Sequence, residues 1–90
     1  MKNKHPYYQL LHVLRRLRNK QIEDFRHFKR DRVNRQWMDH RFFSLTVRKF
    51  REEIKKTDQV IAGVKRAISM SKITGVNHMY DFKTDSVVPM

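Results

Sequence analysis

The chain has 90 residues, which allows one domain with a modest core. Its 21 lysine and arginine residues outnumber nine aspartate and glutamate residues, so the formal net charge of +12 favours a negatively charged partner. The absence of cysteine excludes a disulfide framework and a thiolate metal site, and no apolar run reaches the roughly 18–20 residues that cross a bilayer.

The first predicted helix spans about residues 6–31. Neither proline nor glycine occurs between Pro6 and Gly63, and such a breaker-free run favours helix throughout. Residues 1–22 are basic, amphipathic and free of acids, which is typical of a mitochondrial targeting segment, although an ordinary basic helix of the mature fold has the same pattern. The apolar register runs on past residue 22, which favours a helix of the mature fold, and such an internal helix can also serve as an address. The apolar stripe of this helix consists of Leu10, Leu14, Leu17, Phe25 and Phe28.

The second predicted helix spans about residues 35–56. Asp31 or Asn34 could cap it, and one long helix through residues 29–36 is the alternative. Its apolar face is expected to pack against Leu10, Leu14 and Leu17 of the first helix. The residues of this face are Phe43, Val47, Phe50 and Ile54.

The third predicted helix spans about residues 58–72. Thr57 and Asp58 are favourable N-cap residues ahead of an apolar segment with helical spacing. After Ser71 the periodicity is lost. The sequence thus predicts an all-α fold, an antiparallel three-helix bundle over residues 1–72, with an extended tail over residues 73–90 that packs on a partner. The apolar side chains of this tail are Met79, Tyr80, Phe82, Val87 and Val88.

No arrangement of residues indicates catalysis or metal binding. The five histidines are not spaced as helical metal ligands, and no serine lies in a nucleophile elbow. Glu52 and Glu53 are adjacent and would point about 100° apart on a helix, so they cannot share one substrate atom. We expect a protein that is not an enzyme and that binds no metal or cofactor directly.

A mixed basic and aromatic segment, FRHFKRDRVNRQW, covers residues 25–37. On a helix its basic side chains point away from Phe25 and Phe28, so they can line up along phosphates. One hypothesis is therefore a small RNA-binding structural protein of a ribosome, such as the mitochondrial ribosome, that binds rRNA. The candidate RNA-binding residues are Arg26, Lys29, Arg30 and Arg35.

A second segment, VRKFREEIKKTD over residues 47–58, resembles the second half of the LYR-motif family of small mitochondrial helical proteins. The matching positions are Val47, Arg48, Phe50 and Arg51, with Thr57 seven residues after the phenylalanine. The motif that names the family is degenerate here, because residues 14–16 read Leu-Arg-Arg and lack the tyrosine.

The resemblance implies a three-helix bundle that acts as a non-catalytic accessory subunit or assembly factor of a respiratory-chain, ATP synthase or ribosomal complex. It implies a mitochondrial location, in the matrix or on the matrix side of the inner membrane. It also implies docking of mitochondrial acyl carrier protein, whose acyl-phosphopantetheine chain enters between the helices. Phe50 would line the bundle interior. With a turn near residue 33, we expect two groups of arginines to form one docking patch. These are Arg15, Arg16 and Arg18, and Arg48 and Arg51.

Overall fold

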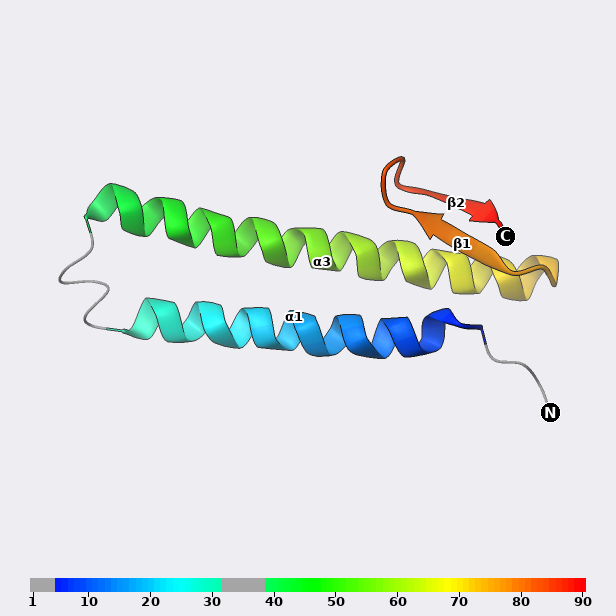
Figure 1. Ribbon diagram of the computed structural model, residues 1–90, viewed down its shortest axis with the longest axis horizontal. Helices are drawn as coiled ribbons and strands as arrows, with labels where there is room; N and C mark the ends of the chain where they lie inside the picture. Colours follow the sequence, from blue (N-terminus) through cyan, green and yellow to red (C-terminus); the bar gives the residue numbers. More distant parts are fainter. Residues whose placement is uncertain (1–4, 32–38) are drawn as a thin grey trace.

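The computed structural model describes residues 5–31 and 39–90 and consists of two long antiparallel helices and a β-hairpin (Figure 1). The helices are α1 (Tyr7–Arg30) and α3 (His40–Thr74), and the strands are β1 (His78–Asp81) and β2 (Ser86–Pro89). The chain is mostly helical, as expected, but the predicted three-helix bundle is wrong. The residues predicted to form the second and third helices lie in one helix of 35 residues.

The predicted break at residues 57–58 does not occur because both candidate cap residues make contacts within the helical hairpin. The Thr57 hydroxyl is almost fully buried, 2.9 Å from Gln21 Oε1 of α1 and 3.0 Å from the carbonyl oxygen of Glu53. Asp58 pairs with Arg18 of α1. The helix ends instead at Gly75, whose left-handed φ of 74° suits a residue without a Cβ.

The two helices pack along a seam in which residues recur at alternating steps of three and four. This seven-residue period is typical of coiled coils and keeps one stripe of each helix facing the other. On α1 the seam residues are Tyr7, Leu11, Leu14, Arg18, Gln21, Phe25 and Phe28. On α3 they are Phe43, Val47, Phe50, Ile54, Thr57, Ile61, Val64, Ile68 and Ser71.

The composition of the seam changes along its length. Where α1 ends and α3 begins, which we call the turn end, Phe25 stacks on Phe50 with ring centroids 5.4 Å apart. Phe28 stacks on Phe43 at 5.2 Å. The opposite end, which we call the terminal end, has an aliphatic core. Its buried residues are Leu11, Ile61, Val64 and Ile68. The contacts of Arg18 and Gln21 with α3 form a polar layer between the two halves.

This register corrects two details of the predicted packing. Phe50 lies against Phe25 and Phe28, and not against the leucines near the start of α1. Leu10 and Leu17 are 39% and 45% exposed. Residues 10 and 11 are both leucine, so the sequence pattern allowed either to face α3, and the structure buries Leu11.

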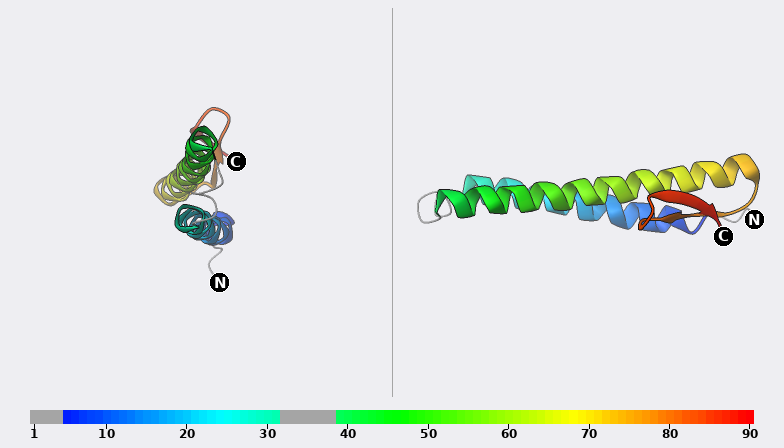
Figure 2. Two further views of the ribbon diagram at one scale, coloured as in Figure 1. Left: turned by 90° about the vertical axis from the view of Figure 1, so that its left-hand side faces the viewer. Right: turned by 90° about the horizontal axis from the view of Figure 1, so that it is seen from above.

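Residues 78–89 form an antiparallel hairpin, so the prediction of a single extended tail is wrong, because the tail folds back and pairs with itself. His78 pairs with Pro89 and Tyr80 pairs with Val87. The hairpin lies alongside the last part of α3, at the same end of the molecule as the start of α1 (Figure 2). Packing of the tail on a partner stays a prediction.

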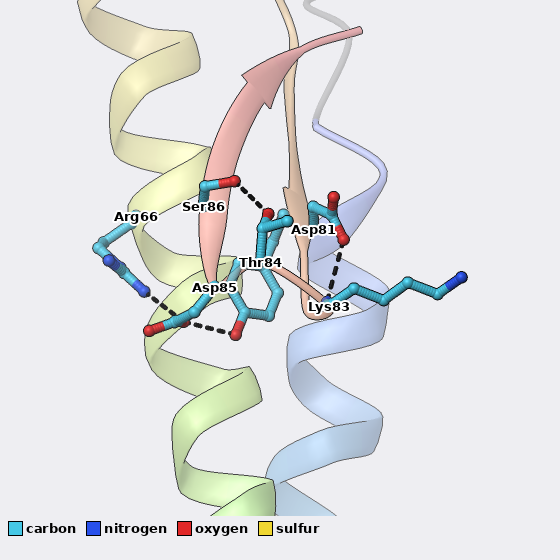
Figure 3. Close-up of polar contacts among 7 residues, drawn as sticks. Arg66, Asp81, Lys83, Thr84, Asp85 and Ser86 are labelled. Atoms are coloured by element: carbon cyan, nitrogen blue, oxygen red, sulfur yellow. Dashed lines mark hydrogen bonds and ion pairs between the residues drawn. The ribbon is translucent and has the colours of Figure 1, made fainter.

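Tyr80 holds the hairpin on the helices. Its ring is buried over Gly63 of α3, where an added Cβ would overlap the ring atom Cε1. The Tyr80 hydroxyl donates to Asp85 at 2.7 Å, and Arg66 of α3 donates to the same carboxylate at 3.0 Å (Figure 3). The Tyr80 amide donates to the Tyr7 hydroxyl of α1 at 3.2 Å. Tyr80 thus joins all three parts of the fold through its side chain and its main-chain amide.

Candidate nucleic-acid interface

The seam leaves two sides of the helical hairpin available for other contacts. The β-hairpin covers part of one side, where Tyr80 packs over Gly63. On the other side the Lys72 ammonium lies over the Tyr8 ring, 5.8 Å from its centroid, and Arg18 meets Asp58. In an antiparallel pair, residues spaced by seven from these contacts stay on the same side.

We call this second side the basic side. Positions 8, 15, 22 and 29 of α1 and 51, 58, 65 and 72 of α3 line it every seven residues, and the adjacent positions 26, 41, 48 and 55 lie just outward. Asp58 is the one acidic residue among these described positions, and the seam residue Arg18 reaches this side to pair with it. With Arg18, the basic residues of this side are Arg15, Arg18, Arg26, Lys29, Arg41, Arg48, Arg51, Lys55, Lys65 and Lys72.

The opposite side has a different charge balance. Lys49 and Lys56 recur in the helix column that contains Gly63, so they lie on the side that the hairpin occupies further along α3. Asp24 and Glu53 flank the seam on that side, and the hairpin adds two more carboxylates, Asp81 and Asp85. Positive charge is therefore concentrated on the basic side, as an anionic partner requires.

Shallow hollows lie on the surface of both helices near the turn end. One, on α3, has Phe43 and Val47 in its floor and Arg48 and Arg51 among its lining residues. The other follows α1 and is lined by Arg18, Asn19, Ile22, Glu23, Arg26, His27 and Arg30. Guanidinium groups beside such open hollows can each hold a phosphate or carboxylate oxygen pair.

The structure brings together candidate residues from both sequence hypotheses. Phe50 stacks on Phe25, so Arg48 and Arg51 lie level with Arg26 and Lys29 of α1. They do not lie level with Arg16 and Arg18, because Arg18 faces Asp58. The single patch expected for these two arginine groups is therefore not formed.

The remaining candidate residues have other positions. Arg16 and Arg30 are exposed on the outer surface of α1, and Phe50 is half-buried in the seam. The Lys29 ammonium lies 4.3 Å from the centroid of the Phe25 ring, so it makes a cation–π contact within the helical hairpin. Arg35 lies outside the described residues.

The sequence hypotheses missed three lysines of the basic side, Lys55, Lys65 and Lys72. Their signal was the seven-residue recurrence of positions 51, 58, 65 and 72, which becomes visible only when α3 is treated as one helix. The assumed break at residue 57 concealed it.

Tyr80, Asp85 and Arg66 together hold the β-hairpin on α3, and we call this contact the hairpin anchor. Two of its ionisable groups have shifted pKa values. The hydrogen bond from Tyr80 holds the pKa of Asp85 below its usual value of 3.8, and Arg66 acts in the same direction. The same hydrogen bond, together with burial, raises the pKa of Tyr80 above 10.0. These shifts stabilise the neutral tyrosine and the charged carboxylate, as expected for a structural contact.

The described residues were also compared with the requirements of a metal site and of a membrane-spanning helix. Within 5–31 and 39–90, no group of three or more histidine and acidic residues could hold a metal ion. Neither described helix contains a segment sufficiently long and apolar to span a bilayer. No family model, curated protein or solved structure matches this chain.

Proposed function

We propose that this protein is a non-catalytic, RNA-binding structural component of a larger assembly, and that the basic side holds the RNA backbone. The observation that supports the proposal is the placement of ten basic residues on one side of a helical hairpin, with one paired acid among them. Such a surface contacts phosphates without reading bases, and it releases counterions when it does so.

The width of the basic side favours RNA over a DNA major groove. Its residues come from two helices that pack side by side, and each helix is about 10–12 Å across with its side chains. The pair is therefore wider than the major groove of B-DNA, which is about 12 Å and admits one helix. An A-form RNA duplex presents a wide, shallow minor groove with phosphates along both edges, which such a surface can cover.

The proposal is tested with two variants that remove the same charge from α3. Arg48→Gln with Lys55→Gln changes the basic side, while Lys49→Gln with Lys56→Gln changes the neighbouring helix column. We expect the first variant to weaken RNA binding at least five-fold more than the second in fluorescence anisotropy titrations at about 0.15 M salt. Equal losses would show that only net charge matters, and no RNA binding by the native protein would refute the proposal.

A second proposal follows from the resemblance of residues 47–58: an accessory subunit that docks acyl carrier protein. Arg48 and Arg51, which match the family, are exposed and could meet an acidic helix of the carrier. However, the family's acyl chain enters a three-helix bundle, and the described residues contain two helices and a hairpin. Recovery of a phosphopantetheine-carrying protein with the tagged chain would favour this proposal, and a mitochondrial location of the tagged chain would support both.

A further inference from the structure

The two outer edges of the β-hairpin differ in how far their backbone groups are hydrogen-bonded. The Met90 amide donates to the Asn77 carbonyl at 2.9 Å, so these two residues form a hydrogen-bonded pair of the ladder. Such pairs alternate along antiparallel strands. His78 and Tyr80 of β1, and the residues of β2 opposite them, therefore point their backbone groups outward.

The outer edge of β1 is satisfied by side chains from the rest of the molecule. The His78 amide donates to Ser71 Oγ at 2.7 Å. His5 Nε2 donates to the His78 carbonyl at 2.9 Å, because its Nδ1 accepts from the Tyr7 amide. The Tyr80 amide donates to the Tyr7 hydroxyl at 3.2 Å. These contacts occupy the groups that a further strand would need on this edge, which lies nearer to α1 (Figure 1).

The outer edge of β2 has no such partners among residues 5–31 and 39–90. It presents the amide and the carbonyl of Val87 and the carbonyl of Pro89, whose nitrogen carries no hydrogen. Within sheets, proline is found mainly where the missing amide would face outward, so Pro89 is consistent with an open edge. The backbone groups of such an edge can accept an additional strand.

A hollow beside this open edge is lined by residues of α3 and β2. Met70, which is 40% exposed, and Val87 give it apolar surface. Two basic residues also line it, but Arg66 already pairs with Asp85. Lys65 is exposed. The full set of lining residues is Lys65, Arg66, Ser69, Met70 and Val87.

The charge and spacing of the hollow favour an acidic strand as its occupant. A second copy of this chain would bring another net charge of +12, which is unfavourable beside Lys65. Lys65 and Ser69 are four positions apart on α3, about 6 Å along the axis. Residues two positions apart on a strand share a face and lie about 6.6 Å apart. One such pair, apolar and acidic, can therefore place one side chain in the hollow and the other beside Lys65.

We propose that the open edge of β2 binds an extended, acidic segment of a neighbouring protein as a third strand. The segment makes main-chain hydrogen bonds with Val87 and Pro89, places an apolar side chain over Met70 and directs a carboxylate to Lys65. This inference goes beyond the RNA-binding proposal and does not depend on it. It also specifies how residues 73–90 contact a partner.

Hydrogen exchange of the full chain, followed by NMR, tests the difference between the two edges. We expect the Val87 amide to exchange at least about ten-fold faster than the His78 and Tyr80 amides, relative to unstructured peptides. Equal protection of all three amides would show that the β2 edge is already covered, and would overturn the proposal.

Strand addition is tested with a peptide of about eight residues that repeats valine, threonine, glutamate and threonine, so that valine and glutamate share one face. We expect it to slow exchange of the Val87 amide. Val87→Pro removes this outward amide without removing a ladder hydrogen bond, and we expect about ten-fold weaker binding. Protection of the Tyr80 amide shows that the variant hairpin is folded. N-methylation of the peptide amides along one edge should cause a similar loss in the native protein.

The charge contact is tested with a matched pair of variants. Lys65→Gln should weaken binding of the peptide up to about five-fold, as expected for a partly exposed ion pair. Lys55→Gln, which removes the same charge about 15 Å away along α3, should leave binding within about two-fold of the native value. Equal losses would mean that only net charge matters, and would overturn the assigned contact.

The remaining outcomes separate other occupants from the one proposed. A peptide with lysine in place of glutamate that binds equally well would overturn the acidic occupant, and an N-methylated peptide that binds equally well would overturn the added strand. A dimer of the native chain that Val87→Pro dissociates would assign the edge to a second copy. No binding of the acidic peptide by the native chain at millimolar concentration would refute the proposal, whatever the result with RNA.

Discussion

The two ends of the helical hairpin bury their seam residues to different extents. At the terminal end Val64 is 1% exposed and Ile68 is 6% exposed, whereas at the turn end the four stacked phenylalanines are only half-buried. The difference has a simple geometric cause. Two helices alone cannot surround a large side chain, and among residues 5–31 and 39–90 only the terminal end has a third element, the β-hairpin, packed beside them. We therefore infer that the terminal end contributes most of the stability.

Among the variants that compare the two ends, Tyr80→Ala should cause the largest loss of stability. It removes a buried ring from over Gly63 together with the hydrogen bond to Asp85, so we expect a loss of about 3–5 kcal/mol in the free energy of unfolding. Urea unfolding followed by circular dichroism measures the loss. Tyr8→Ala, which changes a more exposed ring at the same end, is the control. A similar loss in both variants would contradict the assigned role of the hairpin.

Gly63→Ala should destabilise the protein by about 1–3 kcal/mol, because the new methyl group would overlap the Tyr80 ring. In a background that already carries Tyr80→Ala, the same change should instead stabilise by up to about 1 kcal/mol, since alanine favours helix over glycine. This reversal of sign, measured as a double-mutant cycle, would localise the overlap to one pair of residues. A loss of equal size in both backgrounds would show that the ring is not the cause.

Phe50→Ala tests the turn end. A fully buried phenylalanine costs about 3–5 kcal/mol when truncated, and the half-burial of Phe50 between Phe25 and Phe28 lowers the expected loss to about 1–2 kcal/mol. Chemical denaturation under the conditions used for the tyrosine variants gives the comparison. A larger loss than that of Tyr80→Ala would show that the turn end contributes more to stability than the terminal end.

Arg18→Gln tests the polar layer and should have a small effect on stability. Its ion pair with Asp58 is partly exposed, and such pairs contribute about 0–1 kcal/mol. We expect the difference from the native protein to shrink further as salt is added, because exposed charges are screened. A loss well above this range that persists at high salt would indicate that the pair is more important to the register than its exposure suggests.

The stability of the hairpin anchor should decrease at both low and high pH. Because the pKa of Asp85 is lowered in the folded state, its contribution is present above the usual 3.8 and is lost as the pH falls through the folded value. The raised pKa of Tyr80 has the opposite sense, so its contribution is present below 10.0 and is lost as the pH rises through the folded value. The protection factors of the hairpin amides, in which the exchange rate is divided into that of an unstructured peptide at the same pH, should be largest between these limits. Asp85→Asn should remove the decrease in protection on the acidic side.

The helical content could be predicted from the sequence, but the number of helices could not. Thr57 and Asp58 have a strong local preference for N-caps, and only the positions of Gln21 and Arg18 in space show that contacts with α1 outweigh it. The hairpin was missed for a related reason. Its strands are four residues each, and they are stabilised by a docking position over Gly63 that lies well before them in the sequence.

The candidate interface was predicted in composition and missed in arrangement. Excess positive charge and individual arginines were evident from the sequence, because charge does not depend on register. Which arginines lie together depends on the residue of α3 that faces each residue of α1. With Arg18 facing Asp58, Arg48 moves from the group at residues 15–18 to the group at residues 26–30. A local pattern cannot supply this information.

The seven-residue period of the seam makes the length of this protein adjustable. Inserting seven residues into each helix at matching levels would extend both by about 10.5 Å while every seam residue still faced its partner. Unequal insertions would separate the residues of the polar layer and misalign the two helices. The length of the basic side can therefore increase in steps of one heptad without redesign of the packing.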